Sequence, residues 1–224
     1  MLVGEPSQPA VVSRARQIWL LVEYGVLFFA LAGVYTLIGH PGSPVPFLVL
    51  SALGVVLYLR SRPDFDRRDF LRPRAIRGQL RPVLTLWALA AVAVLLALLI
   101  LSPGRLFELP RRDPIVWVIV LVAYPLLSVY PQELIFCGFL FHRYAPVFGT
   151  GNGFVAASAA AFGFVHIIYG QWLSVVLTVI LGAVLARRFA RTRSLAVVWL
   201  EHALYGLLAF TVGLGSFFYN GAGD

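Results

Sequence analysis

The sequence predicts an all-α, polytopic transmembrane bundle of about seven or eight helices, in a single integral membrane domain over residues 1–224. Three observations carry this prediction: the composition, the recurrence of long apolar segments, and the placement of the charges. Hydrophobic residues make up 60 % of the chain and charged residues 12 %, with a mean hydropathy of +0.85. Because soluble domains are about 45–50 % apolar and about 25 % charged, a water-soluble fold of this length cannot bury so much apolar surface.

The apolar segments set the order of the predicted helices. The first follows a polar stretch, residues 1–16, and carries no small-residue cleavage site, so we expect it to be retained as a membrane helix. The fourth is longer than one simple span requires and contains Pro125 and Pro131, which predicts a kink or a break there. Seven segments approach the ~20 residues that cross a bilayer: residues 17–38, 45–59, 83–102, 115–141, 154–169, 171–186 and 194–217.

The basic residues indicate the topology. All 18 are arginine, and a cytoplasmic N-terminus places all but Arg105, Arg111 and Arg112 on the cytoplasmic side. This asymmetry is the positive-inside pattern of inserted helices, so the membrane accounts for the net charge of +8 without a nucleic-acid partner. The basic stretch 61–82 is expected to be a cytoplasmic loop against anionic headgroups of the lipid bilayer. The absence of lysine indicates a GC-rich bacterial genome, and hence a bacterial cytoplasmic membrane.

Ionisable residues inside the apolar segments are the candidate functional groups, because each is costly at that depth unless it is paired. They are Glu23, Glu133, His166, Glu201 and His202. Helical rise places Glu133, His166 and His202 roughly 15, 20 and 13 Å from the cytoplasmic ends of their helices. These depths are compatible with one shared site in the core region, residues 115–217.

A carboxylate and two imidazoles can activate water as bases, hold a zinc ion with an open position, or relay protons. Polar pairing that only specifies helix packing is the alternative for each residue. Phe162 lies one turn before His166 and shares its helix face. The small residues at 156–161 predict close packing of that helix against its neighbours.

Three stretches in order, 130–140, 162–166 and 200–206, resemble the CAAX-protease and bacteriocin-processing (CPBP or Abi) family of intramembrane peptidases. The resemblance implies an endopeptidase that hydrolyses a peptide, or a prenylated protein, near the cytoplasmic membrane face. It implies that His166 activates the attacking water together with the first glutamate of the family motif, that Glu133 is a carboxylate of the site, and that His202 stabilises the oxyanion. It also admits zinc or another divalent metal, with Glu133, His166 and His202 as the candidate ligands.

The chain departs from the family motifs at three positions. Gln132 stands where the family has the first of two adjacent glutamates, Cys137 where it has an arginine, and Gly206 where it has an asparagine. A neutral amide cannot take a proton from water, although it can orient one. We therefore favour Glu133 as the base, with Glu201 beside His202 as the other source of an acid.

These departures leave Gln132, Phe162 and Glu201 as supporting or substrate-binding residues. They also motivate an alternative function, a catalytically impaired relative that acts as a membrane binding or immunity-type protein. A proton-coupled transporter that uses the same glutamate and histidines is a third class, although the sequence shows no pair of discontinuous helices.

Overall fold

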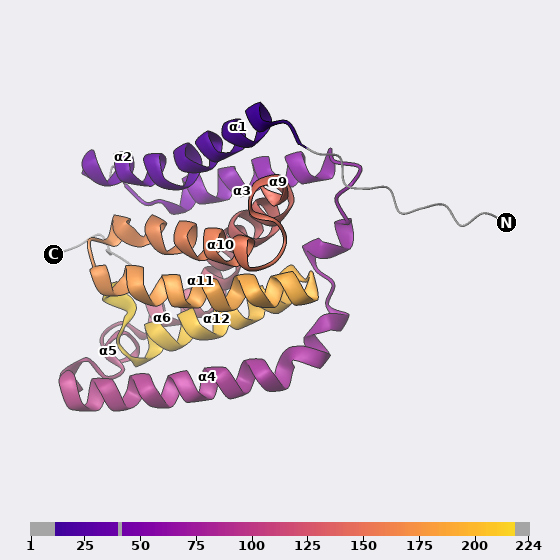
Figure 1. Ribbon diagram of the computed structural model, residues 1–224. Coiled ribbons are helices and arrows are strands. Elements are labelled where there is room, and N and C mark those ends of the chain that lie inside the picture. The colour runs from indigo at the N-terminus through magenta and orange to yellow at the C-terminus, as the bar shows by residue number, and fades with distance from the viewer. Residues whose placement is uncertain (1–11, 40–41, 218–224) are drawn as a thin grey trace.

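The computed structural model describes residues 12–39 and 42–217, so most of the predicted cytoplasmic N-terminus, residues 1–16, lies outside the described residues. Within them the chain is an all-α bundle, which confirms the predicted fold class (Figure 1). Six of its helices are long and apolar enough to cross a membrane, and Val45–Arg60 is a shorter apolar helix. These seven helices follow the seven apolar segments in order.

The elements run along the bundle and are joined by short turns (Figure 1). The N-terminal half contains α1 Arg14–Gly25, η1 Val26–Ala30, α2 Leu31–Leu37, α3 Val45–Arg60, η2 Arg67–Phe70, α4 Arg74–Leu101, η3 Pro103–Arg105 and α5 Glu108–Arg112. The C-terminal half contains α6 Pro114–Tyr124, η4 Pro125–Val129, α7 Tyr130–Glu133, η5 Leu134–Phe139, α8 Leu140–Arg143, α9 Ala145–Phe148, α10 Asn152–Val165, η6 His166–Tyr169, α11 Trp172–Thr192, α12 Leu195–Val212 and η7 Gly215–Phe217.

The long fourth span stays helical through both prolines. Residues 114–143 form one apolar helix, in which the wider π-helical turns η4 and η5 flank the short α7. Because Pro125 brings no N–H and crowds the preceding turn, a wider turn accommodates it without a break. The Pro125 carbonyl accepts a hydrogen bond of 2.7 Å from the Trp199 indole on α12. The distortion predicted for this span is therefore a widening of the helix into π-helical turns, and not a break. One such turn precedes the short helix that holds Gln132 and Glu133, and the other follows it.

The basic stretch 61–82 is only partly a loop, because α4 begins at Arg74 and continues through Pro82 into the apolar segment. Its non-helical part is tied to the turn between α11 and α12. The buried carboxylate of Asp69 pairs with both Arg72 and Arg193, and the Ser194 hydroxyl donates to the Leu71 carbonyl. Burial raises the pKa of the Asp69 carboxyl, and the Arg193 and Arg72 guanidiniums oppose that rise.

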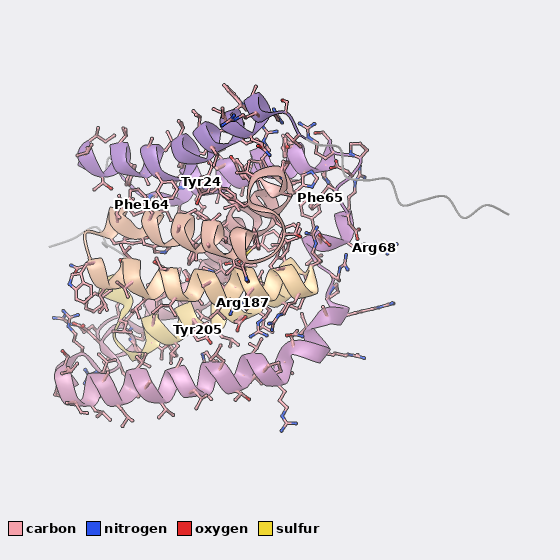
Figure 2. All side chains as sticks on the ribbon, viewed as in Figure 1. Tyr24, Phe65, Arg68, Phe164, Arg187 and Tyr205 are labelled. Carbon is pink, nitrogen blue, oxygen red and sulfur yellow. The ribbon has the colours of Figure 1, made fainter. Side chains whose placement is uncertain are left out.

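Arginines gather at one end of the bundle, where Figure 2 shows Arg68, while Arg105 lies near Gly213 at the other end. The two clusters thus occupy different ends of the helices, as the predicted topology requires. Which end faces the cytoplasm stays a prediction.

Helices α10 and α11 pack with glycines at the contact, as the small residues predicted. A Cβ atom on Gly163 would overlap the Val179 side chain and lie 3.1 Å from the Val179 Cα. A Cβ on Gly182 would lie 3.1 Å from the Ala159 Cα. This close approach fixes the position of Phe162, which directly precedes Gly163, and of His166, which begins η6 where α10 ends.

Replacement of Gly163 by alanine is expected to lower the free energy of unfolding by about 1–3 kcal/mol, because the added methyl forces the two helices apart. Gly33→Ala is the matched control, since nothing lies within 4 Å of a Cβ at that helical glycine. Denaturant unfolding of both variants in the same detergent measures the difference. Equal stability of the two variants would show that α10 and α11 can accommodate a methyl group at Gly163 without strain.

Candidate active site

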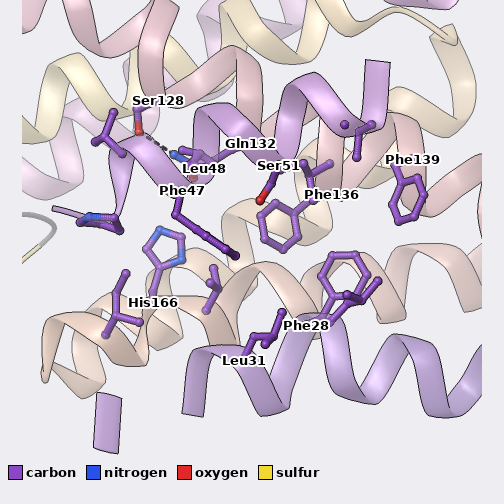
Figure 3. A pocket seen from close by; sticks show the side chains of 18 of the residues that line it. Phe28, Leu31, Phe47, Leu48, Ser51, Ser128, Gln132, Phe136, Phe139 and His166 are labelled. Atoms are coloured by element: carbon purple, nitrogen blue, oxygen red, sulfur yellow. Dashed lines mark hydrogen bonds between the residues drawn. The ribbon is translucent and has the colours of Figure 1, made fainter. Parts of the chain in front are cut away.

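A cavity of about 520 Å³ opens between α1–α2, α3, α7–η5 and η6. Its size is within the ~300–1,000 Å³ typical of ligand sites. Figure 3 shows His166, Gln132 and Ser128 at one end and the rings of Phe28 and Phe139 toward the other. A mostly apolar cavity with a few polar groups at one end suits an apolar ligand that must be oriented for a reaction.

His166 presents a basic nitrogen to this cavity. It begins η6 directly after α10, and its Nδ1 lies 2.6 Å from the Phe162 carbonyl oxygen. Since a carbonyl only accepts hydrogen bonds, Nδ1 carries the proton in the neutral ring and Nε2 keeps its lone pair. The His166 side chain lines the cavity and is only 9 % exposed. It therefore has the geometry of a general base at a sheltered site.

Gln132 also lines the cavity, on α7. Its amide nitrogen donates a hydrogen bond of 2.7 Å to the hydroxyl of Ser128, which lines the cavity as well. This bond fixes the orientation of the amide group. Gln132 can therefore hold a water or a substrate carbonyl, but it cannot take a proton.

Glu133 and His202 form a buried dyad outside the cavity lining. Glu133 Oε1 lies 2.7 Å from His202 Nδ1, and the two residues are 1 % and 3 % exposed. The Phe162 ring contacts both imidazoles, with centroid distances of 4.8 Å to His166 and 5.3 Å to His202. The residues that the sequence placed in one site are thus neighbours, but only His166 and Gln132 face the cavity.

Cys137 stands beside the dyad. Its thiol interacts with the Glu133 carboxylate, as expected for residues one turn apart, and with Ser158 on α10. The other carboxylate oxygen, Glu133 Oε2, is buried without a hydrogen-bond partner. A thiol, unlike a guanidinium, brings no positive charge to the Glu133 carboxylate.

Glu201 points away from the cavity and is fully buried. Both of its oxygens pair with the Arg188 guanidinium, the Nη2–Oε1 distance being 2.8 Å, and Arg188 Nη1 donates to Gln79 Oε1 at 2.8 Å. This network ties α4, α11 and α12 together. Glu201 therefore supports the bundle, and the contacts give it no role at the cavity.

Glu23 lies at the cavity end away from His166. Arg143 binds it with two hydrogen bonds, Nε–Oε1 at 2.9 Å and Nη2–Oε2 at 2.6 Å, and the Tyr144 hydroxyl adds a third at 3.0 Å. Glu23 and Arg143 both line the cavity. The sequence pointed to Glu23 as an intramembrane carboxylate but assigned Arg143 only to topology, because nothing in the spacing pairs helices 120 residues apart.

A divalent metal was an expectation for Glu133, His166 and His202. Among residues 12–39 and 42–217, no three His, Cys, Asp or Glu side chains gather as metal donors. Both ring nitrogens of His202 have partners, Glu133 on Nδ1 and the Tyr124 hydroxyl at 3.2 Å on Nε2. The donor set does not fit a three-ligand centre, so the chemistry below contains no step through a metal.

Comparison with known sequences identifies a family that part of the chain resembles. Residues 113–208 match the sequence model of the Rce1-like family, described as type II CAAX prenyl endopeptidase Rce1-like. This region, called the Rce1-like region below, is similar to that family. The match confirms the resemblance to CAAX proteases that the three motifs indicated. No curated protein and no solved structure matches the chain significantly.

The Rce1-like region runs from the cap of α6 into α12 and contains Gln132, Glu133, His166 and His202. The family is one of peptidases, which supports peptide-bond hydrolysis by an integral membrane protein. Helices α1–α4 lie outside the region. The apolar wall that η1, α2 and α3 give to the cavity is therefore contributed by a part of the chain that the match does not cover.

Proposed function

We propose that the protein is an intramembrane endopeptidase that hydrolyses a peptide bond in the cavity between α1–α3 and the Rce1-like region. The observation that carries the proposal is the His166 Nε2 lone pair, set by the Phe162 carbonyl, at the wall of a sheltered apolar cavity. The family match supports a peptidase. The substrate is a peptide or protein segment, and the apolar lining suits apolar side chains or a prenyl group near the cytoplasmic face.

In this proposal His166 replaces Glu133 as the base. His166 Nε2 removes a proton from a water that the Gln132 amide orients, and the water oxygen bonds to the carbonyl carbon. The tetrahedral intermediate then collapses, the C–N bond breaks, and the imidazolium returns the proton to the leaving amine. The Glu133–His202 dyad lies on the other side of the Phe162 ring from His166. In the low-dielectric interior its negative charge favours the imidazolium that forms on His166 with the intermediate.

His166→Gln is expected to lower cleavage of a quenched membrane-peptide library by about 100-fold or more, because the amide cannot accept the proton. The purified protein is assayed in nanodiscs beside His142→Gln. His142 is the matched control, since it packs on Phe65 at 5.5 Å and does not line the cavity.

Cleavage that survives in His166→Gln at the level of the His142→Gln variant would overturn the assignment of the base. No cleavage by the folded wild-type protein, across a library that includes prenylated peptides, would overturn the proposed activity itself.

A further inference from the structure

Tyr124 occupies a position that a side chain at residue 206 would otherwise fill. Tyr124 ends α6, and Gly206 lies on α12 one turn after His202. A Cβ atom on Gly206 would lie 2.5 Å from the Tyr124 Cζ and would overlap its hydroxyl. No residue larger than glycine fits there while the phenol holds its place.

The phenol uses this space to contact the dyad. The Tyr124 hydroxyl lies 3.2 Å from His202 Nε2, and His202 Nδ1 lies 2.7 Å from Glu133 Oε1. Because Nδ1–H donates to the carboxylate, Nε2 of the neutral ring accepts the phenol proton. Both imidazole nitrogens are thereby fixed, which leaves the ring one orientation and one tautomer.

Tyr124 also connects the dyad with the cavity. It interacts electrostatically with Tyr169, and Tyr169 lines the cavity and packs on the His166 ring at 5.7 Å. On its other side the Tyr124 ring packs edge-on against Phe210 at 5.1 Å. The phenol therefore contacts the buried dyad and also interacts with a residue of the cavity wall.

We propose that Tyr124 is a positioning residue that holds the His202 imidazole from a neighbouring helix, and that Gly206 exists to admit it. A side chain one turn after His202 on α12 would occupy the space of the phenol that contacts His202 Nε2. In this chain the contact comes from α6, and the two arrangements exclude each other sterically. The role of Tyr124 in catalysis rests on the proposed peptidase activity. The mutual exclusion of the Tyr124 phenol and a side chain at residue 206 rests on packing alone.

The kinetic test is Tyr124→Phe, which keeps the ring packing and removes only the hydroxyl. We expect kcat to fall about tenfold, the size of one lost hydrogen bond, with KM and the unfolding temperature unchanged. Tyr205→Phe is the matched control, a half-buried phenol one residue before Gly206. Equal kcat values for Tyr124→Phe and Tyr205→Phe would overturn the positioning role.

The steric test needs no activity. Gly206→Asn alone is expected to lower the unfolding temperature by roughly 5 °C through overpacking, and Tyr124→Ala in addition should recover most of that loss. Strictly additive stability effects would overturn the exclusion, whereas a folded but inactive wild-type protein would overturn only the proposed activity.

Discussion

Arg188→Met is expected to lower the free energy of unfolding by about 3–5 kcal/mol, because it leaves a fully buried carboxylate without its cation. Glu201 is 0 % exposed and both of its oxygens contact Arg188, which also holds Gln79 on α4. Unfolding in a denaturing detergent, followed by the tryptophan signal, measures the change. Arg187→Met is the matched control, an exposed arginine on the preceding position of the same helix.

A double variant separates the buried charge from lost packing. Arg188→Met with Glu201→Met removes both charges and keeps similar volume, so it should recover most of the stability. If the double variant is as unstable as the single one, the lost stability comes from packing and from Gln79 rather than from an unpaired carboxylate.

Glu133→Gln is expected to lower kcat/KM by about 10²–10⁴-fold with little loss of stability. The amide has nearly the shape of the carboxylate, but its N–H can donate to His202 Nδ1 and favour the tautomer with the proton on Nε2. The dyad then loses its negative charge. His202 Nε2, which accepted the Tyr124 hydroxyl proton, carries a hydrogen and becomes a donor toward that hydroxyl. Peptide cleavage in nanodiscs measures the effect, beside Glu108→Gln, a partly exposed carboxylate on α5.

Glu133→Gln with unchanged kcat/KM would contradict the assignment of Glu133 and His202 to catalysis and leave His166 to act without them. Equal losses in Glu133→Gln and Glu108→Gln would point to a general effect of charge on the protein. Only a loss of kcat/KM in Glu133→Gln that is absent in Glu108→Gln supports a catalytic role for the Glu133–His202 dyad.

The helices were predictable because their lengths and order follow from hydropathy. Each apolar segment became a helix, and Pro125 marked the distorted one. That Glu133, His166 and His202 are neighbours was expected from their similar depths, but depth did not indicate which of them pair. Spacing along one helix predicted the contact of His166 with Phe162 and of Cys137 with Glu133.

The partners on other helices were not predictable, because they depend on how each helix is rotated about its axis. Consecutive residues point about 100° apart, and the π-helical turns around α7 shift that phase again. Gln132 therefore faces the cavity while Glu133 faces His202. Nothing in the sequence indicated the roles of Arg188 and Tyr124. An arginine in a basic cluster and a tyrosine in an apolar segment are both common in membrane helices.

The two walls of the cavity come from two separately encoded parts of the chain. Phe28 on η1 and Phe47 and Leu48 on α3 line it from outside the Rce1-like region, which holds the groups proposed to do the chemistry. Mutations in the N-terminal helices can thus reshape what the cavity admits while His166 and the dyad stay fixed. Selection can act on substrate choice and on reaction rate through different segments of one gene.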